Sequence, residues 1–539
     1  MKSRVIPLLL ATIVLLISAC ASTGKNMEAS APFNLVLEGG SVWKGWGSKP
    51  VVADIGIRGD RIVAIGDLSG QVAEQRIAVD GLAVVPGFID IHSHAVRGSR
   101  GSSGIFKHPD AENYIRQGVT TIFGGPDGGS ELPVGQLLDD LERTPASVNF
   151  GTFVGHNSVR EAVMGRQNRA PTAEELEAMK ALVETAMREG AYGLSAGLKY
   201  IPGAYSKTEE VIELARVAGQ YGGIYISHMR EEGLGLIDSV KETIRIGEEG
   251  GLPAQITHHK VMGVDMWGAS KETLALVDAA NARGVDVSSD QYPYAASSTG
   301  ISVLFPAWSL AGKRDVQLAR FHDPETRARI KQGIVYNLVH DRGGDDPSRV
   351  AIANCEWDPS LNGKNFAEVL EARGLPVDMG NAAELALEIV ENGDCFGIFH
   401  AMSEEDVERI MQHPRTMIGS DGGIHVAGEG VPHPRNYGTF SRVLAHYVRD
   451  KQVITTGEAI YKMTRMPAER VGLSDRGRIE VGAMADIAVM DLDTVQDHAT
   501  FAQPHQYSSG VKYVLVNGVM VLRDGQMTGA RPGRSLRSR

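Results

Sequence analysis

The stretch Val84-Val85-Pro86-Gly87-Phe88-Ile89-Asp90-Ile91-His92-Ser93-His94 leads an apolar run directly into two histidines. Residues two apart on an extended strand point to the same face, so the imidazoles of His92 and His94 converge. A chance His-x-His pair on an exposed strand is common, but the apolar run before this pair indicates a buried strand. The stretch therefore predicts part of a metal site.

Three further stretches end an apolar run in a histidine or an aspartate: Ile226-Ser227-His228, Ile256-Thr257-His258 and Ile418-Gly419-Ser420-Asp421. The carboxyl ends of parallel strands are where a (β/α)8 barrel gathers its active site. One such histidine alone is more often a satisfied core residue than a ligand. His259 follows His258 directly, and spacing does not decide which of the two faces the barrel axis. Together the four stretches predict a hydrolase with one or two divalent metal ions.

Asp421 ends the last of these strands. A carboxylate at this place can bind a metal ion. It can also act as general base toward an attacking water, and then as general acid toward the leaving nitrogen of an amide. The alternative is a helix N-cap for the loop that follows. We favour the catalytic role.

The middle of the chain alternates strands with helical runs such as 173–190 and 207–220, as a parallel barrel requires. We expect eight barrel strands, at Val84–His92, Val119–Phe123, Asn149–Val154, Tyr192–Ser195, Gly223–Ser227, Ala254–Thr257, Val285–Ser289 and Thr416–Gly419. Eight is the number that closes such a barrel. The gap before the last strand is much longer than the others, which predicts an inserted subdomain at about 296–413.

The two ends of the chain, 33–83 and 473–530, consist of short alternating apolar runs bounded by Gly and Asp, which is typical of hairpins. We therefore expect an α/β protein with a (β/α)8 barrel over 84–472 and one small β-sandwich built from both ends. The last residues, 531–539, form a basic tail, for which we expect a frayed end.

Residues 1–20 have the features of a signal peptide, with a basic start and an apolar run too short to span a membrane. The ending Ile17-Ser18-Ala19-Cys20 resembles a bacterial lipobox, in which Cys20 carries the lipid; cleavage without lipidation is the alternative. Residues 21–32, small and polar, would form a tether. Ala21 resembles the pattern of outer-membrane lipoproteins. We expect an exported periplasmic lipoprotein that is anchored to the outer membrane.

The 539 residues are 42% hydrophobic and 22% charged, which is ordinary globular composition for more than one domain. A net charge of −12 argues against a nucleic-acid partner. We expect a small-molecule substrate, and a membrane contact only through the lipid anchor. Cys355 and Cys395 could pair in an oxidising compartment, and two buried free thiols are the alternative.

Eight motifs along the chain form a recognisable set. They lie at residues 84–94, 117–121, 155–160, 193–198, 227–230, 290–294, 418–422 and 432–440. The set resembles the amidohydrolase superfamily, and within it the N-acyl-D-amino-acid deacylase (D-aminoacylase) family. The resemblance covers nearly the whole mature chain, down to Val516-Asn517-Gly518.

The resemblance implies two groups of metal ligands, and it selects His258 over His259. The first group is His92, His94 and Asp421, and the second contains His228 and His258. It also implies four partners for the carboxylate and carbonyl of a substrate: Arg230, Lys260, Tyr292 and Arg435. Arginine binds carboxylates bidentately, and lysine supplies a point charge. The alternative to a substrate-binding role for each of these residues is a solvated charge on the protein surface.

Two departures from the family pattern concern the ligand that bridges two metals. D-aminoacylases usually carry Gly-Asn-Cys-Gly after the second strand, whereas this chain has Gly125-Pro126-Asp127-Gly128 and lacks the thiolate. Lys199 stands where family members often have another residue. Related hydantoinases bridge their metals with a carboxylated lysine, so we expect Lys199, as a carbamate, to be the bridge, with Asp127 as the alternative. Either group places an anion between two cations.

The activity that this resemblance implies is metal-dependent hydrolysis of the amide bond of N-acyl amino acids, of D configuration, to a carboxylate and a free amino acid. A dinuclear dipeptidase or cyclic-amide hydrolase is the alternative. A non-catalytic binding relative is a weaker one, because this chain keeps every ligand that we require. Zinc suits a nitrogen- and oxygen-rich site, which manganese or cobalt could also occupy.

Overall fold

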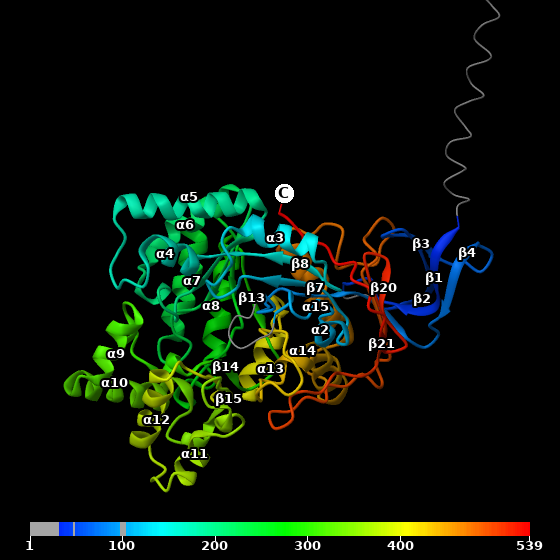
Figure 1. Ribbon diagram of the computed structural model, residues 1–539. Coiled ribbons are helices and arrows are strands. Elements are labelled where there is room, and N and C mark those ends of the chain that lie inside the picture. The colour runs from blue at the N-terminus through cyan, green and yellow to red at the C-terminus, as the bar shows by residue number, and fades with distance from the viewer. Residues whose placement is uncertain (1–31, 47–48, 97–103, 539) are drawn as a thin grey trace, which may run out of the picture.

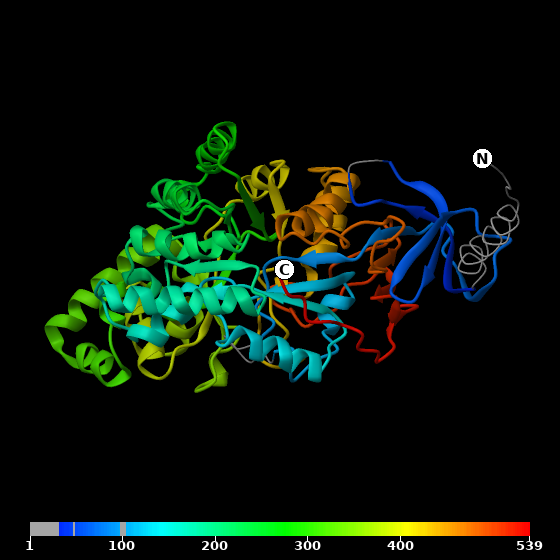
Figure 2. The same ribbon diagram turned by 90° about the horizontal axis from the view of Figure 1, so that it is seen from above.

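The computed structural model describes residues 32–46, 49–96 and 104–538. Figure 1 and Figure 2 show a body with helices packed around strands and, at one end, a lobe made of strands. Among the described residues, no helix is long and apolar enough to cross a membrane. The predicted signal peptide, Cys20 and all but the last residue of the predicted tether lie outside the described residues.

The body contains parallel strands at all eight predicted places. They are β6 (Phe88–Asp90), β7 (Val119–Gly124), β8 (Asn149–Thr152) with β9 (Val154–Gly155), β10 (Gly193–Gly197), β11 (Ile224–His228), β12 (Ala254–Ile256), β13 (Val287–Gln291) and β17 (Thr416–Ile418). The strands form two sheets, of order β6-β7-β8 and β17-β13-β12-β11-β10-β9. Only Phe153 separates β8 from β9, and an isolated parallel bridge between Ser93 and Gly422 joins the far edges. This arrangement confirms the predicted α/β fold, although the described ladders do not close a complete ring.

Helices cover the outer surface of these strands (Figure 1). They include α3 (Val134–Arg143), α5 (Ala173–Glu189), α6 (Thr208–Gln220), α7 (Leu236–Gly250) and α8 (Ser270–Ala282). Every residue of β7, β10 and β11 is buried, as expected for parallel strands that are covered on both faces. Helix α5 begins at a capping box, in which Thr172 and Glu175 satisfy each other's free backbone donors.

The lobe is built from both ends of the chain, as predicted. Its strands are β1 (Phe33–Val42), β2 (Val51–Arg58), β3 (Arg61–Gly66), β4 (Ala73–Ala78), β5 (Ala83–Pro86), β18 (Ile487–Met490), β19 (Val511–Val516), β20 (Val519–Arg523) and β21 (Gln526–Met527). All nine are hydrogen-bonded into one sheet, and the antiparallel pair β5–β18 joins its two halves. One apolar cluster contains residues of both halves, such as Leu37, Ile55, Ile487 and Leu515. Burial of this cluster holds the chain ends together.

The inserted subdomain lies at the end of the body away from the lobe (Figure 1). It holds a three-stranded sheet of order β14-β16-β15, made of Ser297–Gly300, Phe396–Phe399 and Val350–Asn354. Its longer helices are α9 (Arg314–His322), α10 (Pro324–Asn337), α11 (Phe366–Ala372) and α12 (Met379–Glu391). Helix α13 (Glu404–Gln412), predicted within the insertion, instead leads into β17 as a barrel helix does.

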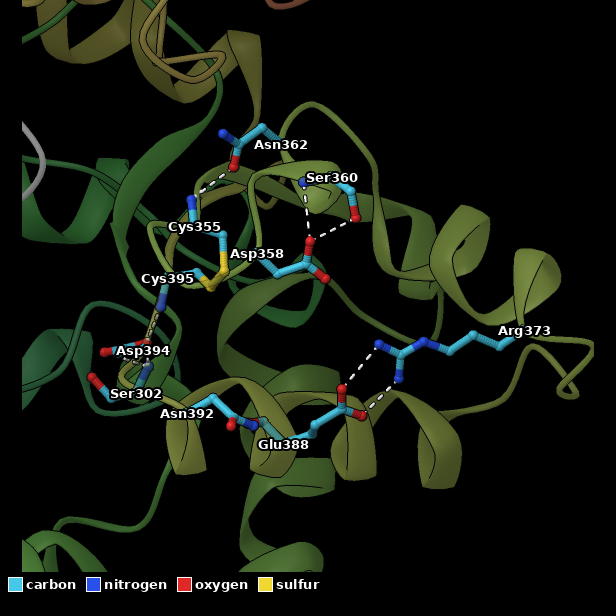
Figure 3. Close-up of a disulfide and its surroundings, with 10 residues drawn as sticks. All are labelled: Ser302, Cys355, Asp358, Ser360, Asn362, Arg373, Glu388, Asn392, Asp394 and Cys395. Carbon is cyan, nitrogen blue, oxygen red and sulfur yellow. Dashed lines mark hydrogen bonds and ion pairs between the residues drawn. A yellow bond between two sulfur atoms is a disulfide. The ribbon is translucent and has the colours of Figure 1, made fainter.

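A disulfide between Cys355 and Cys395 fastens the end of β15 to the start of β16 (Figure 3). The sequence left open whether these residues pair. Figure 3 also shows Asp394, whose carboxylate accepts a hydrogen bond from the backbone N–H of Ser302. The disulfide thus links two neighbouring antiparallel strands of the insertion at one end of their pairing.

The C-terminal tail does not fray as predicted. The N–H of Phe150 donates to the carbonyl of Arg534 at 3.0 Å, and the N–H of Leu536 donates to the carbonyl of Phe150 at 2.7 Å. Strand β8 is the edge of its sheet, so its outer backbone groups are available for pairing. The tail is therefore ordered along this edge.

Candidate metal centre

Four side chains from three strand ends meet in the first ligand group. Their ligand atoms lie within 4.8 Å of one another, and the residues are His92, His94, Asp127 and Asp421. The Nε2 atoms of His92 and His94 lie 3.6 and 3.0 Å from Oδ1 of Asp421. The same nitrogens lie 3.6 and 3.4 Å from the carboxylate of Asp127. The sequence predicted three of these residues as one group, and Asp127 joins them.

The second group consists of Asp127, His228 and His258. Nδ1 of His228 lies 2.7 Å from Nε2 of His258, and these atoms lie 3.9 and 3.3 Å from the carboxylate of Asp127. His259 faces away, because its Nε2 is 2.9 Å from the hydroxyl of Thr273. Asp127 is therefore common to both groups, at the position that a bridging ligand requires.

The loop that carries Asp127 is held by backbone and serine contacts. The N–H of Gly128 donates to Oγ of Ser195 at 3.2 Å, and that hydroxyl donates to the carbonyl of Gly125 at 2.5 Å. The N–H of Ser158 donates to the carbonyl of Gly128 at 3.1 Å. These bonds hold Asp127 at a φ of 53° and so fix the direction of its carboxylate.

Asp127, His258 and Asp421 are three of the eight non-glycine residues with positive φ in the described part of the chain. Their φ angles are 53°, 36° and 50°. Left-handed backbone is unfavourable for residues with a Cβ and persists where the surrounding structure enforces it. The concentration of such residues at the two ligand groups indicates a functional site.

Electrostatics and donor chemistry both fit a divalent cation. Nε2 of His92 is buried and has no hydrogen-bond partner among the described residues. Burial opposes ionisation of Asp421, but Arg435 and His92 outweigh it and lower the pKa of this carboxyl. The pKa of Asp127 is likewise lowered, against the effect of burial, by His258 and His92. Two buried carboxylates among imidazoles form the nitrogen and oxygen donor set that zinc and similar divalent metals bind.

The expectation that Lys199 bridges the metals is corrected. Its Nζ lies 2.8 Å from Glu231 and 3.0 Å from Asp341, in an ion pair that faces the insertion. Burial opposes its charge, but Asp341 and Glu231 outweigh this and raise the pKa of Lys199. A carbamate forms from a neutral amine, so these carboxylates disfavour it. Lys199 stands two residues beyond β10, where the chain has already turned away from the strand direction.

Three of the four predicted substrate-binding residues line one cavity with Asp127 and Asp421: Lys260, Tyr292 and Arg435. An Nη of Arg435 lies 2.7 Å from Asp421, and its guanidinium stacks over the ring of Tyr292 at 4.8 Å. Arg230 does not join them. It binds Glu242 through two hydrogen bonds of 3.0 and 2.8 Å and lines a neighbouring cavity of about 880 Å³.

The sequence analysis missed three charged residues around the centre. Asp290, at the end of β13, lies 3.3 Å from Nδ1 of His92 and accepts a hydrogen bond from the N–H of His258. Glu232 and Arg342 also line the cavity. The position of Asp290 near a strand end was a usable signal, but Arg342 comes from the insertion, where periodicity gives no information.

Comparison with known proteins places this site in a family. The family model described as Amidohydrolase family matches residues 75–522. A D-aminoacylase from Alcaligenes xylosoxydans xylosoxydans is 39% identical over 534 residues, which cover 95% of this chain and 99% of that protein. An N-acyl-D-glutamate deacylase from the same organism is 36% identical, over 94% of this chain and 96% of that protein.

Solved structures agree with these relatives. A crystal structure of D-aminoacylase has a TM-score of 0.79 at 37% identity and covers 94% of this chain and all of its own. An N-acyl-D-glutamate deacylase from Bordetella bronchiseptica, complexed with zinc and a phosphonate mimic of the tetrahedral intermediate, has a TM-score of 0.81 at 32% identity, with the same coverage. A D-hydantoinase, at 14% identity and a TM-score of 0.58, shares the fold alone. The chain therefore belongs to the amidohydrolase family, in the group of the D-aminoacylases and related N-acyl-D-amino-acid deacylases.

Proposed function

We propose that this protein is a metal-dependent hydrolase that cleaves the amide bond of N-acyl-D-amino acids and releases a carboxylate and a free amino acid. The observation that carries this function is the pair of ligand groups sharing Asp127 at the carboxyl ends of the barrel strands. Relatives that span nearly the whole chain are D-aminoacylase and N-acyl-D-glutamate and N-acyl-D-aspartate deacylases.

The residues that would hold divalent cations, zinc in the first instance, are His92, His94, Asp127 and Asp421 on one side and Asp127, His228 and His258 on the other. A cation held there supplies Lewis-acid polarisation of the scissile carbonyl and lowers the pKa of an attacking water. The absence of the family thiolate leaves a donor set of imidazoles and carboxylates only. Such a set also accepts manganese and cobalt.

Asp421 accepts the proton of the attacking water and gives it to the leaving nitrogen. Its carboxylate is buried at the cavity wall and kept ionised by Arg435, so it is available as the proton acceptor. Arg435, stacked on Tyr292, lines the cavity, where its guanidinium would bind the carboxylate of the amino acid. The ammonium of Lys260 lines the same cavity.

The test is an assay of the purified protein, after metal analysis, on matched N-acetyl-D- and N-acetyl-L-amino acids. We expect bound metal, turnover of the D series, and loss of turnover after a chelator that zinc restores. Preferential turnover of dipeptides or cyclic amides, or a protein that binds no metal, would contradict the proposal.

We further propose that the protein is exported and is lipidated at Cys20, which anchors it to the outer membrane. The lipobox-like ending at residues 17–20 supports this. The disulfide Cys355–Cys395 also supports it, because disulfides persist in the periplasm and are rare in the cytosol. Labelling with radioactive palmitate and membrane fractionation test the proposal. Cys20→Ser should abolish both labelling and membrane association.

A further inference from the structure

Glu232 lies behind both histidines of the second ligand group. It is 1% exposed and follows His228 by four residues, on the loop after β11. Its Oε1 is 3.3 Å from Nδ1 of His258, and its Oε2 is 3.7 Å from Nε2 of His228. The other ring nitrogens, Nε2 of His258 and Nδ1 of His228, face Asp127. Glu232 therefore lies on the side of each ring that is opposite to Asp127.

The position of the proton on His258 decides whether the residue can bind a metal. With the proton on Nε2, Nδ1 accepts a hydrogen bond from the ammonium of Lys260, which is 2.6 Å away. With the proton on Nδ1, Nε2 presents its lone pair, and the carboxylate oxygen Oε1 of Glu232 lies 3.3 Å from the protonated nitrogen. Only the second tautomer can ligate through Nε2, so Lys260 and Glu232 act on His258 in opposite directions.

Glu232 also neutralises Lys260, because Nζ of Lys260 lies 2.6 Å from its Oε1. Both side chains are at most 2% exposed, so water screens this charge weakly. An uncompensated ammonium beside His258 would repel a cation on the other nitrogen of the ring. The carboxylate therefore favours metal binding twice, by selecting the tautomer and by balancing the charge.

The insertion contributes a further contact to this carboxylate. An Nη of Arg342 lies 3.8 Å from Oε2 of Glu232, and Nε of Arg342 lies 3.3 Å from Asp341. Asp341 in turn pairs with Lys199 at 3.0 Å. Lys199, Asp341, Arg342 and Glu232 therefore form a chain of side chains with alternating charge. This chain runs from the loop after β10, through the insertion, to His258.

We propose that Glu232 is a positioning residue for the second ligand group: it orients His228 and His258 for metal binding, opposes Lys260, and is held in place by Arg342 of the insertion. The inference rests on the metal centre of the proposed function. It is specific to this group, since the first group has Asp290 beside His92 instead.

The experiment measures zinc binding to the full-length protein, stripped with a chelator and titrated in competition with a chromophoric chelator. We expect Glu232→Gln to weaken one of two zinc sites by about 10- to 100-fold, the usual effect of removing a carboxylate behind a ligand histidine, and to leave the other unchanged. Glu231→Gln is the matched control, because this neighbour on the same loop pairs with Lys199 and has no recorded contact with either histidine.

A double variant separates positioning from general disruption. Glu232→Gln with Lys260→Met removes both opposing groups, and we expect zinc affinity to recover relative to Glu232→Gln alone.

Two further variants grade the effect. Glu232→Asp should retain part of the zinc affinity, and Arg342→Met should weaken the same site by a smaller factor than Glu232→Gln. Wild-type affinity at both sites in Glu232→Gln, an equal loss in Glu231→Gln, or no recovery in the double variant would overturn the inference. The proposed function itself fails only if the wild-type protein binds no metal or lacks deacylase activity.

Discussion

The two ligand groups of the metal centre are held by different means. In the first group, backbone hydrogen bonds join the ligand segments directly. The N–H of Asp421 donates to the carbonyl of His92 at 2.8 Å, and the N–H of His94 donates to the carbonyl of Gly422 at 2.6 Å. The carboxylate of Asp90 accepts from the N–H groups of both His92 and Ser420. The geometry of this group follows from the backbone bonds that join the segment after β6 to the segment after β17.

In the second group, buried charges stand behind the ligands. Glu232 and Lys260 contact His258, and Arg342 reaches Glu232 from the insertion. Backbone hydrogen bonds persist when one side chain is changed. Removal of one partner from a buried charge network leaves the other partner as an uncompensated charge. Changes to Glu232, Lys260 or Arg342 should therefore affect the second group more than the first.

Removal of Asp127, the residue common to both groups, should weaken both groups alike. We expect this change to have the largest effect on metal affinity and activity. We expect Asp127→Ala to weaken metal binding in both groups at once and to lower kcat/KM by at least about 10³-fold, since the bridging anion is lost. Metal analysis and kinetics check this. Asp127→Cys should restore zinc binding and bind manganese more weakly than the wild-type protein, because thiolates favour zinc. Two occupied sites in Asp127→Ala would show that Asp127 is not the bridge.

A change confined to the first group should separate catalysis from the second group. Asp421→Asn removes a ligand and the proton acceptor, so we expect kcat to fall by about 10²- to 10⁴-fold. The zinc site formed by Asp127, His228 and His258 should keep its affinity in the same titration. Unchanged kcat at full metal occupancy would assign the proton transfer to another residue.

Loss of Lys199 tests the charge network without touching a ligand. We expect Lys199→Met to keep its full metal content and to lower the free energy of unfolding by about 3 kcal/mol, because Asp341 loses a buried partner. Denaturant unfolding and metal analysis measure the two quantities. Loss of a metal ion from this variant would return the bridging role to Lys199.

The smallest effect on activity is expected from the disulfide. The bond closes a segment with a sequence separation of 40 residues, so replacing both Cys355 and Cys395 by serine should cost about 2 to 4 kcal/mol of stability. If the insertion supports the second group through Arg342, the affinity of that group should fall slightly and that of the first should not. Equal changes at both groups would argue against this separation.

Much of the architecture could be predicted because its signals are local. The eight barrel strands appear as apolar runs, and they lie within a few residues of their predicted places. Five candidate ligands at strand ends could be named because an imidazole or carboxylate that closes an apolar run is visible without the fold, and the structure brings them into two groups. The strand-rich ends were equally visible, and they share one sheet as expected. Val84–Pro86, predicted as the start of the first barrel strand, instead belongs to β5 and pairs with β18 in the lobe. The tail at 531–538 was mispredicted because its composition does not reveal the open edge of β8.

Which side chains end the strands could be inferred from the sequence, since burial and alternation are properties of short segments. The preference for Asp127 over Lys199 as the bridge comes from the fold, because it depends on a left-handed backbone at Asp127 and on carboxylates that reach Lys199 from elsewhere in the chain. The same holds for Glu232 and Arg342, which lie 110 positions apart by their residue numbers. Their contact depends on how the insertion packs against the barrel, and a long-range contact of this kind leaves no periodic signal in one sequence.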